Sequence, residues 1–210
     1  MQTIARPTKY SLSLPRTGQD VQKELLRKSI HMCIAAVPTI AEIAGVDFTL
    51  FLLAAGVLVY SWSEMRRMNG KAVPVISRIT QLASRDRDQG HFVLGPVALG
   101  IGAMMALLLY PYPAAVLAIY ALAFGDGLSS VVGKFFGRVR IPGTGGKTIA
   151  GSLTCFAAIF VAGVAVTNDI LSAALIALVG TAVEALPVKD FDNILLPMAT
   201  GLAAQLLVIM

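Results

Sequence analysis

The residue with the clearest chemical potential is Asp126, which lies inside an otherwise apolar stretch. Hydroxyl side chains and glycines follow it at helical spacing, so one side of a helix would carry a carboxylate and a nearly bare surface. These residues are Ser129, Ser130, Gly133 and Gly137. A carboxylate there can hold Mg2+ or accept the proton of a hydroxyl group. Glycines at this spacing also pack membrane helices together, but packing does not account for Asp126.

Residues 138–152 form a basic, glycine-rich loop that leads into the next apolar stretch. Its freed backbone N–H groups, the N-terminus of the following helix and Lys147 together suit the binding of phosphates. The loop is not a Walker A motif, because Ile141 stands where that pattern requires a glycine five residues before Gly146. A flexible positive loop beside a membrane is the structural alternative.

Acidic residues gather near the end of the sixth apolar stretch. Glu184 lies within that stretch, where a charge is costly unless it faces a partner or a wet cavity. Asp192 and Asn193 follow shortly afterwards. Together these side chains offer the hard oxygen ligands that Mg2+ prefers.

Basic residues stand at the start of the first apolar stretch. Arg27 and His31 are one helical turn apart, with Lys28 between them. Glu64 and Arg67 form a similar pair at the end of the second stretch. The residues alone leave two roles open for each group, as anchors at the membrane surface or as part of a site.

The composition places these residues in a membrane. Of the 210 residues, 56% are hydrophobic and 14% are charged, and the mean hydropathy is +0.75, which does not describe a water-exposed surface. We predict an all-α, polytopic membrane bundle of about seven transmembrane helices. The stretches are residues 29–45, 48–62, 92–110, 114–132, 150–167, 170–188 and 194–210. The first two are joined so closely that they form either a tight hairpin or a partly re-entrant pair.

Basic residues also predict the orientation of the bundle. All 17 lysines and arginines lie before the first stretch, between the second and third, between the fourth and fifth, or after the sixth. Cytoplasmic loops collect such residues, so we expect a cytoplasmic N-terminus and a C-terminus outside. Residues 1–28 would be a basic cytosolic leader with an interfacial helix, in which Glu24 reaches Lys28. Residues 29–210 would form a single transmembrane catalytic domain.

Net charge and cysteine content exclude other classes. A formal charge of +5 would suit nucleic acid, but the apolar content assigns it to loops beside anionic lipid, and we expect no nucleic-acid partner. Cys33 and Cys155 are isolated, so neither a disulfide framework nor a CxxC metal site is available.

Four segments resemble those of the CTP-dependent lipid kinases, which comprise dolichol kinase, phytol kinase and eukaryotic-type CTP-dependent diacylglycerol kinase. Residues 27–31 match the family's Arg-Lys-x-x-His element, and residues 125–137 match its Gly-Asp-x-x-Ser/Ala-x-x-x-Gly-x-x-x-Gly segment. Residues 147–152 resemble its Lys-Ser/Thr-x-x-Gly-Ser segment, and Glu184 with residues 192–193 resembles its Glu-then-Asp-Asn ending. The short chain fits the compact, phytol-kinase-like members. The family is distantly similar to phosphatidate cytidylyltransferases.

The resemblance implies a set of site residues. The catalytic residues would be Asp126, Lys147, His31 and Glu184, and Mg2+ would be bound by Asp126, Glu184 and Asp192. Which carboxylate acts as base and which as metal ligand stays open. The nucleotide and its phosphates would contact a larger set, which is Arg27, Lys28, Gly125, Gly127, Ser130, Gly133, Lys134, Gly137, Thr148, Gly151, Ser152 and Asn193.

The implied reaction is transfer of the γ-phosphate of CTP to the hydroxyl of a lipid alcohol, with Mg2+ as cofactor. The alcohol would be a prenol such as phytol, geranylgeraniol or a polyprenol, or diacylglycerol, and it would arrive from the bilayer. An enzyme that makes a CDP-lipid and a small transporter are the alternatives. The site would face the cytoplasm from a prokaryotic inner membrane, or from a eukaryotic endoplasmic reticulum or plastid membrane. The oligomeric state stays open.

Overall fold

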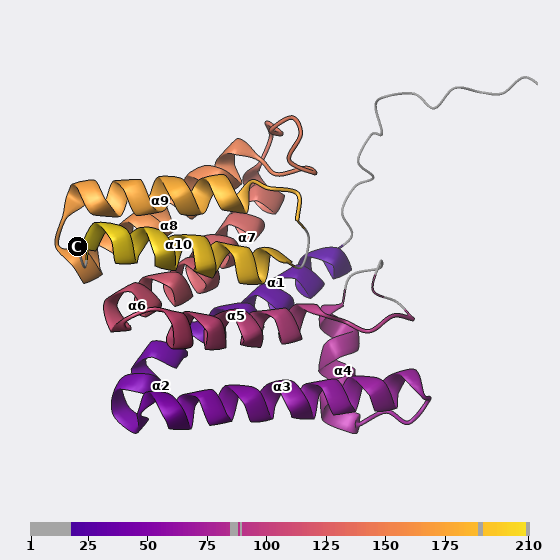
Figure 1. Cartoon of the computed structure of the whole chain (residues 1–210). Helices are drawn as coiled ribbons and strands as arrows, with labels where there is room; N and C mark the ends of the chain where they lie inside the picture. Colours follow the sequence, from indigo (N-terminus) through magenta and orange to yellow (C-terminus); the bar gives the residue numbers. More distant parts are fainter. Residues whose placement is uncertain (1–17, 85–87, 89, 189–190, 209–210) are drawn as a thin grey trace, which may run out of the picture.

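The computed structural model describes residues 18–84, 88, 90–188 and 191–208. Within these ranges the regular elements are helices, and one isolated β-bridge joins Arg140 to Thr148. The all-α prediction is therefore confirmed. The helices, shown in Figure 1, are α1 (Gly18–Met32), η1 (Cys33–Ala36), α2 (Val37–Ala44), α3 (Val46–Met68), α4 (Pro74–Ala83), α5 (Gly95–Leu109), α6 (Tyr112–Tyr120), η3 (Ala121–Asp126), α7 (Gly127–Phe136), α8 (Ile149–Thr167), α9 (Ile170–Glu184) and α10 (Asp192–Val208).

Three helical segments are long and apolar enough to cross a membrane. They are α3, the continuous segment from α6 through η3 to α7, and α8. Three shorter apolar helices, α5, α9 and α10, have 15, 15 and 17 residues. The chain is therefore a membrane protein with several apolar helices. The described residues do not show seven full spans, and the orientation of the N-terminus stays a prediction.

The first predicted span, residues 29–45, is not one helix. The α-helix α1 ends at Met32, a 3₁₀ turn follows, and α2 begins with Pro38 in its first turn. With 8 residues, α2 rises only about 12 Å, well short of the roughly 30 Å hydrocarbon core. Gly45 then joins α2 directly to α3 with φ of +91°, a conformation that glycine adopts without strain. This short, direct connection agrees with the prediction that the first two stretches form a tight hairpin or a partly re-entrant pair, and the count of seven spans stays a prediction.

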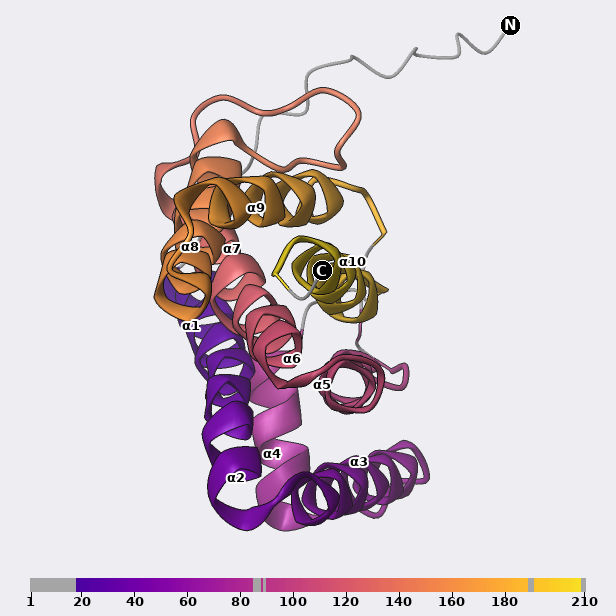
Figure 2. The same ribbon diagram turned by 60° about the vertical axis from the view of Figure 1, so that its left-hand side comes forward.

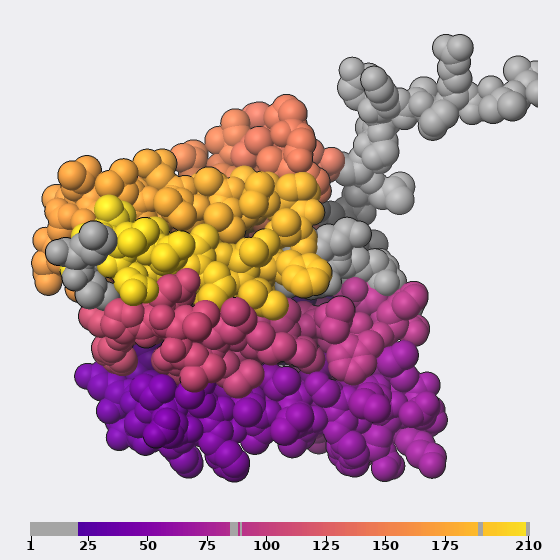
Figure 3. Space-filling model, viewed as in Figure 1, coloured from indigo at the N-terminus to yellow at the C-terminus, as the bar shows by residue number. Residues whose placement is uncertain are grey.

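The segment from α6 to α7 is the centre of the bundle (Figure 2). In the most apolar 18 residues of this segment, 67% of the residues are buried. The corresponding shares are 11% for α3 and 22% for α8. One buried cluster, including Leu117, Ile159 and Ile176, joins it to α8, α9 and α10, and a second, including Ile119, joins it to α2 and α5. Figure 3 shows α3, α5 and α10 forming one continuous surface. Exposed apolar side chains on these helices, such as Phe51 of α3, Leu108 of α5 and Leu202 of α10, suit contact with lipid.

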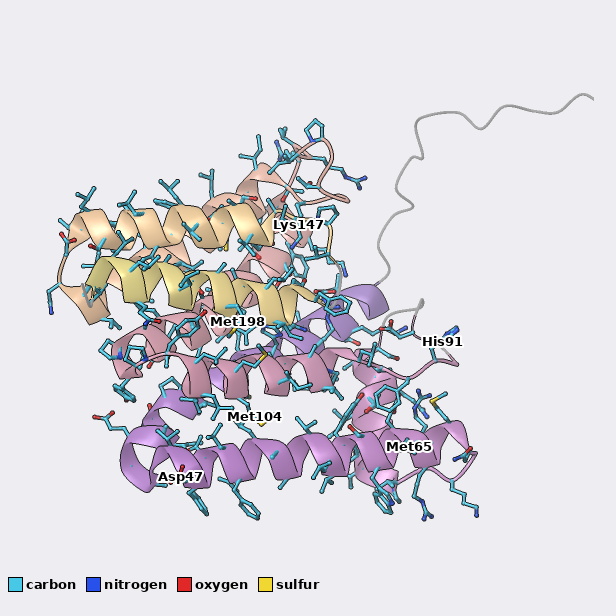
Figure 4. All side chains as sticks on the ribbon, viewed as in Figure 1. Asp47, Met65, His91, Met104, Lys147 and Met198 are labelled. Carbon is cyan, nitrogen blue, oxygen red and sulfur yellow. The ribbon has the colours of Figure 1, made fainter. Side chains whose placement is uncertain are left out.

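The two ends of the bundle differ in chemistry. Figure 4 shows Asp47 at one end of α3, and Met65, His91 and Lys147 toward the opposite end. Near the Asp47 end the connections are short, as between α8 and α9, where Asp169 caps α9 by accepting from the backbone N–H groups of residues 171 and 172. We call the other end, which holds Lys147, the start of α1 and residues 137–148, the ionic end.

Candidate active site

Asp126 is the last residue of η3, a π-helical turn within the central segment. Such turns are frequent at functional sites. The side chain is buried, and its Oδ2 accepts a hydrogen bond from Lys28 Nζ at 2.5 Å. His31 Nε2 lies 3.3 Å from the same oxygen. Helix α1 therefore brings two of the predicted site residues to the predicted catalytic carboxylate.

His31 has a second contact that fixes its protonation pattern. Its Nε2 lies 2.8 Å from the carbonyl oxygen of Leu122, which can only accept a hydrogen bond. In the neutral ring Nε2 therefore carries the proton and Nδ1 the lone pair. A proton-accepting role for His31 would have to use Nδ1.

Glu184 and Lys147 form a second ion pair. Lys147 Nζ donates to Glu184 Oε1 at 2.5 Å, and Ser129 Oγ donates to the same oxygen at 3.1 Å. Burial acts to lower the pKa of Lys147, but the carboxylates of Glu184 and Asp126 outweigh it and raise that pKa above its ordinary value. Lys147 is therefore a firmly protonated cation at neutral pH.

A third cluster joins α1 to α7. Glu24 accepts a hydrogen bond from Lys134 Nζ at 2.6 Å and another from Arg27. Burial acts to raise the pKa of Glu24, but Arg27, Lys134 and Lys28 together lower it below its ordinary value. The predicted pairing of Glu24 with Lys28 is wrong, because Lys28 turns inward to Asp126 while Glu24 binds the other two cations.

Residues 137–148 form an ordered loop over the start of α8. Ile141 N–H donates to the Lys147 carbonyl at 2.9 Å, and Ile149 N–H donates to the Val139 carbonyl at 3.0 Å. Three glycines at positions 143, 145 and 146 have positive φ between 68° and 106°. These contacts give the loop a defined shape, and its predicted role in phosphate binding stays a prediction.

Thr148 has a structural role at the loop's end. Its Oγ1 accepts from Gly151 N–H at 3.2 Å and so caps α8. A Cβ on Gly133 would come within 2.8 Å of the same Oγ1. The glycine spacing of α7 therefore serves close helix packing, which was one interpretation of the sequence. Gly133 also lines the polar cleft described next.

The polar cleft opens at the ionic end, with a volume of about 1360 Å³ including its open mouth. Its cations are Arg27, Lys134, Arg140 and Lys147, of which Arg140 was not predicted as a site residue. Sequence spacing gave no reason to select Arg140, because the β-bridge to Thr148 places it there. The predicted site residues that line the cleft are Arg27, Ser130, Gly133, Lys134, Gly137, Lys147, Thr148, Gly151, Ser152, Glu184 and Asp192.

A second cavity, the apolar pocket, lies beside the polar cleft and has a volume of about 780 Å³. Lys28, His31, Asp126 and Asn193 line it, so these four predicted residues lie on the pocket and not on the cleft. Most of the remaining wall is apolar or aromatic and was not predicted, namely Ile30, Tyr60, Ala83, Val93, Leu94, Pro96 and Leu99. Arg27 and Asp192 line both cavities, so the two share a border.

Unpartnered polar atoms are concentrated at the polar cleft. Across the described part of the chain, four buried side-chain atoms lack a hydrogen-bond partner, and three of them belong to Arg27, Ser152 and Glu184. All three residues line the cleft. Buried polar atoms are nearly always hydrogen-bonded, so these three atoms indicate a cleft built to receive a polar ligand.

Gly125 and Gly127 line neither cavity. A Cβ on Gly125 would lie 3.1 Å from Ile159, and one on Gly127 would lie 2.9 Å from Met32. Both glycines allow the central segment to pack against α8 and α1. Their position does not support the predicted contact with nucleotide.

The pair formed by Glu64 and Arg67 has a structural role. Arg67 donates to Glu64 at 2.6 and 2.8 Å, which confirms the predicted pairing. Glu64 Oε1 also accepts from Val93 N–H at 3.0 Å, and Arg67 donates to the His91 carbonyl at 2.8 Å. The pair therefore holds the segment before α5 against α3.

The carboxylates do not form a ready-made metal cage. No group of three or more potential ligands from His, Cys, Asp and Glu is arranged for a metal among the residues that the structure describes. Glu184 nevertheless keeps one unpartnered oxygen, and Asp192 lines the same cleft. This donor set fits Mg2+, which is commonly held by one or two carboxylates together with substrate phosphates.

Comparison with curated proteins identifies relatives in plants. The chain is 26% identical over 157 residues to phytol kinase 1 of Arabidopsis thaliana, covering 66% of this chain and 52% of that protein. It is 26% identical over 224 aligned residues to a probable phytol kinase of Triticum aestivum, covering 89% and 68%. It is 29% identical over 141 residues to a farnesol kinase of Arabidopsis thaliana, covering 59% and 46%. The chain is a homologue of these phytol and farnesol kinases.

This phytol kinase homologue spans about half the length of the Arabidopsis proteins that it matches. No protein-family model and no solved structure matches it. The resemblance to the phytol-kinase-like lipid kinases, predicted from four short segments, is confirmed by relatives whose matches extend over much of the chain.

Proposed function

We propose that the chain is a membrane kinase that transfers the γ-phosphate of CTP to the hydroxyl of a prenol. The observation that carries this proposal is the pair of cavities that share Arg27 and Asp192 at the ionic end. A cleft with four cations suits a triphosphate, and a largely apolar pocket suits a hydrocarbon chain. The names of the plant relatives support a prenol as the acceptor.

The donor would occupy the polar cleft. Phosphoryl transfer asks mainly for charge neutralisation and alignment, which cationic side chains and backbone donors provide. Lys134 and Lys147 would contact phosphate oxygens, and the glycines of residues 143–146 would let backbone N–H groups approach them. The preference for CTP rests on the family resemblance.

Mg2+ would accompany the nucleotide. Glu184 and Asp192 would hold it from the wall of the polar cleft. Asp126, the third predicted ligand, lines the adjoining apolar pocket. When bound, the ion would neutralise charge on the phosphates.

The acceptor hydroxyl would meet Asp126, which lines the apolar pocket with Lys28 and His31. Asp126 would accept the hydroxyl proton, while Lys28 and His31 would orient its carboxylate through Oδ2. This assignment gives the base role to Asp126 and the main metal role to the two acids of the cleft.

Turnover of the purified full chain in lipid tests the proposal. Labelled CTP and ATP would be compared with Mg2+ across phytol, farnesol, geranylgeraniol and diacylglycerol. CDP with a prenyl monophosphate is the expected result. Pyrophosphate with a CDP-lipid would reassign the chain as a cytidylyltransferase, and absence of nucleotide turnover with every acceptor would favour the transporter alternative.

A matched pair of lysine variants sharpens that assay. Lys147→Met removes a cation of the cleft, whereas Lys71→Met removes an exposed lysine that lines neither cavity. Only Lys147→Met should markedly lower turnover at a CTP concentration below the wild-type KM. Equal loss in both variants would contradict a donor site in the polar cleft.

We also propose that the protein crosses the membrane several times, with the ionic end on the cytoplasmic or equivalent side. The concentration of lysine and arginine in the segments around that end supports this orientation. The chloroplast location in the relatives' names supports a plastid membrane among the membranes predicted.

A further inference from the structure

We infer that α4 lies in the membrane surface and forms the wall of the apolar pocket that faces the bilayer. The lipid acceptor would enter the pocket beneath this helix. The inference rests on the proposed function for the identity of the ligand. It assigns a role to a helix that carries none of the predicted site residues.

The polarity of α4 is reversed relative to a helix that faces water. Its outer side chains Val75, Ile79 and Leu82 are 69%, 43% and 51% exposed. Its fully buried side chains are the hydroxyls Ser77 and Thr80, while Ile76 and Ala83 are partly buried. Helices on a soluble surface place their apolar face inward, so this outward face requires an apolar covering.

The covering is best assigned to lipid, because the apolar face continues onto α3. Trp62 near the end of α3 is 54% exposed, and the guanidinium of Arg66 lies 5.2 Å from the centroid of its ring. An exposed tryptophan beside an arginine is typical of the boundary between membrane and water. Figures 1 and 2 show α4 crossing the ionic end of α3 instead of running alongside it. Arg78, exposed on α4, can extend from such a position to the headgroups.

The opposite side of α4 lines the apolar pocket. Thr80 and Ala83, with Ser84 at the helix end, form this part of the wall. Leu99 of α5 and Asp126 of the central segment also line the pocket. A lipid alcohol bound there would place its chain against apolar side chains and its hydroxyl near the buried carboxylate. One helix therefore separates the bilayer from the acceptor pocket.

Helix α4 and the segment before α5 both contribute to the pocket wall. The segment before α5 is held by Glu64, which accepts from the backbone N–H of Val93, and by Tyr60, whose hydroxyl donates to the Val93 carbonyl at 3.0 Å. The main contacts of α4 are with α1 and α3. Helix α4 therefore packs against α1, which carries Lys28 and His31, and against α3, which holds the segment before α5.

A photoreactive geranylgeraniol analogue tests the location in wild-type protein. We expect labelling within residues 80–84 or 93–99, which contribute to the pocket wall, and we expect excess unlabelled geranylgeraniol to suppress it. Labelling confined to the outer faces of α3 and α8, unaffected by competitor, would overturn the inference. Because this readout needs no CTP, labelling at residues 80–84 or 93–99 without any kinase turnover would count against the proposed function alone.

Two phenylalanine variants of α4 then test its wall role. Ala83→Phe adds bulk to the pocket, and Val75→Phe adds the same side chain to the outer face. We expect Ala83→Phe to raise the KM for the alcohol about tenfold, with the KM for CTP unchanged, and Val75→Phe to change neither. An unchanged alcohol KM in Ala83→Phe, or equal effects of the two variants, would overturn the inference. If Ala83→Phe fails to fold, the labelling result decides.

Discussion

Replacement of Asp126 by asparagine separates the structural role of this residue from its chemical role. Asp126 and Lys28 are 3% and 4% exposed, and they form an ion pair with an N–O distance of 2.5 Å. The substitution leaves a buried ammonium group without its counter-charge. Breaking a buried pair from one side costs about 3–5 kcal/mol, so we expect Asp126→Asn to be markedly less stable than the wild type.

A second substitution should restore stability but not activity. Lys28→Met removes the buried ammonium group that Asp126→Asn leaves without a counter-charge, so the double variant should recover much of the lost free energy. Loss of a general base typically lowers turnover by about 10²–10⁴-fold, and the double variant should keep that defect. The pair of variants therefore distinguishes a misfolded enzyme from a folded enzyme without its base.

The two cysteines provide the stability assay. Cys155 is buried and Cys33 is exposed, so in a Cys33→Ser background a thiol-reactive dye reports unfolding through Cys155 alone. Dye reaction would be followed on heating in detergent, and turnover would be measured on the same samples. Near-normal turnover in a folded Asp126→Asn or double variant would refute the assignment of Asp126. Unchanged thermal stability in Asp126→Asn would refute the buried-pair argument.

Three further predictions concern the polar cleft and its support. Lys147→Met should raise the KM for the nucleotide about tenfold or more while prenol binding is retained. Equilibrium binding of labelled CTP and of a labelled prenol would check that only the nucleotide affinity falls. Gly133→Ala should cost about 1–3 kcal/mol in the dye assay, because the added Cβ would lie 2.8 Å from Thr148 Oγ1, whereas Gly56→Ala, with nothing within 4 Å, should not destabilise the protein. Because folding lowers the pKa of Glu24, its contribution to stability is present above its ordinary pKa of 4.5 and is lost as the pH falls further through the folded value. Glu24→Gln should flatten that acid limb when unfolding midpoints are measured from neutral to acid pH, and an unchanged limb would contradict the role of Glu24.

Many residues that line the two cavities of the candidate site could be selected from the sequence. A carboxylate such as Asp126 or Glu184 in an apolar stretch is costly without a partner, so its presence alone signals a site. The glycines of the loop before α8 indicated an unusual backbone, and residues 143, 145 and 146 do have the positive φ that glycine adopts readily. Helical spacing also predicted the pair of Glu64 and Arg67.

Other expectations failed because hydropathy measures solubility in lipid and does not measure helix continuity. The first apolar stretch contains a 3₁₀ turn and a proline, and it becomes parts of α1, η1 and α2. The partner of Lys28 was also missed, since helical spacing suggested Glu24 and long-range packing supplied Asp126, 98 residues away. No local pattern contains that information.

The sequence by itself determined a helical membrane protein with buried acids, basic loops and a resemblance to lipid kinases, because side-chain polarity and short motifs are properties of the chain. Only the tertiary structure decided which acid meets which cation. It also divided the predicted residues between a polar cleft and an apolar pocket, and it assigned α4 to the pocket wall. These features depend on contacts between helices far apart in the chain, whose geometry is set by packing around the central α6 to α7 segment.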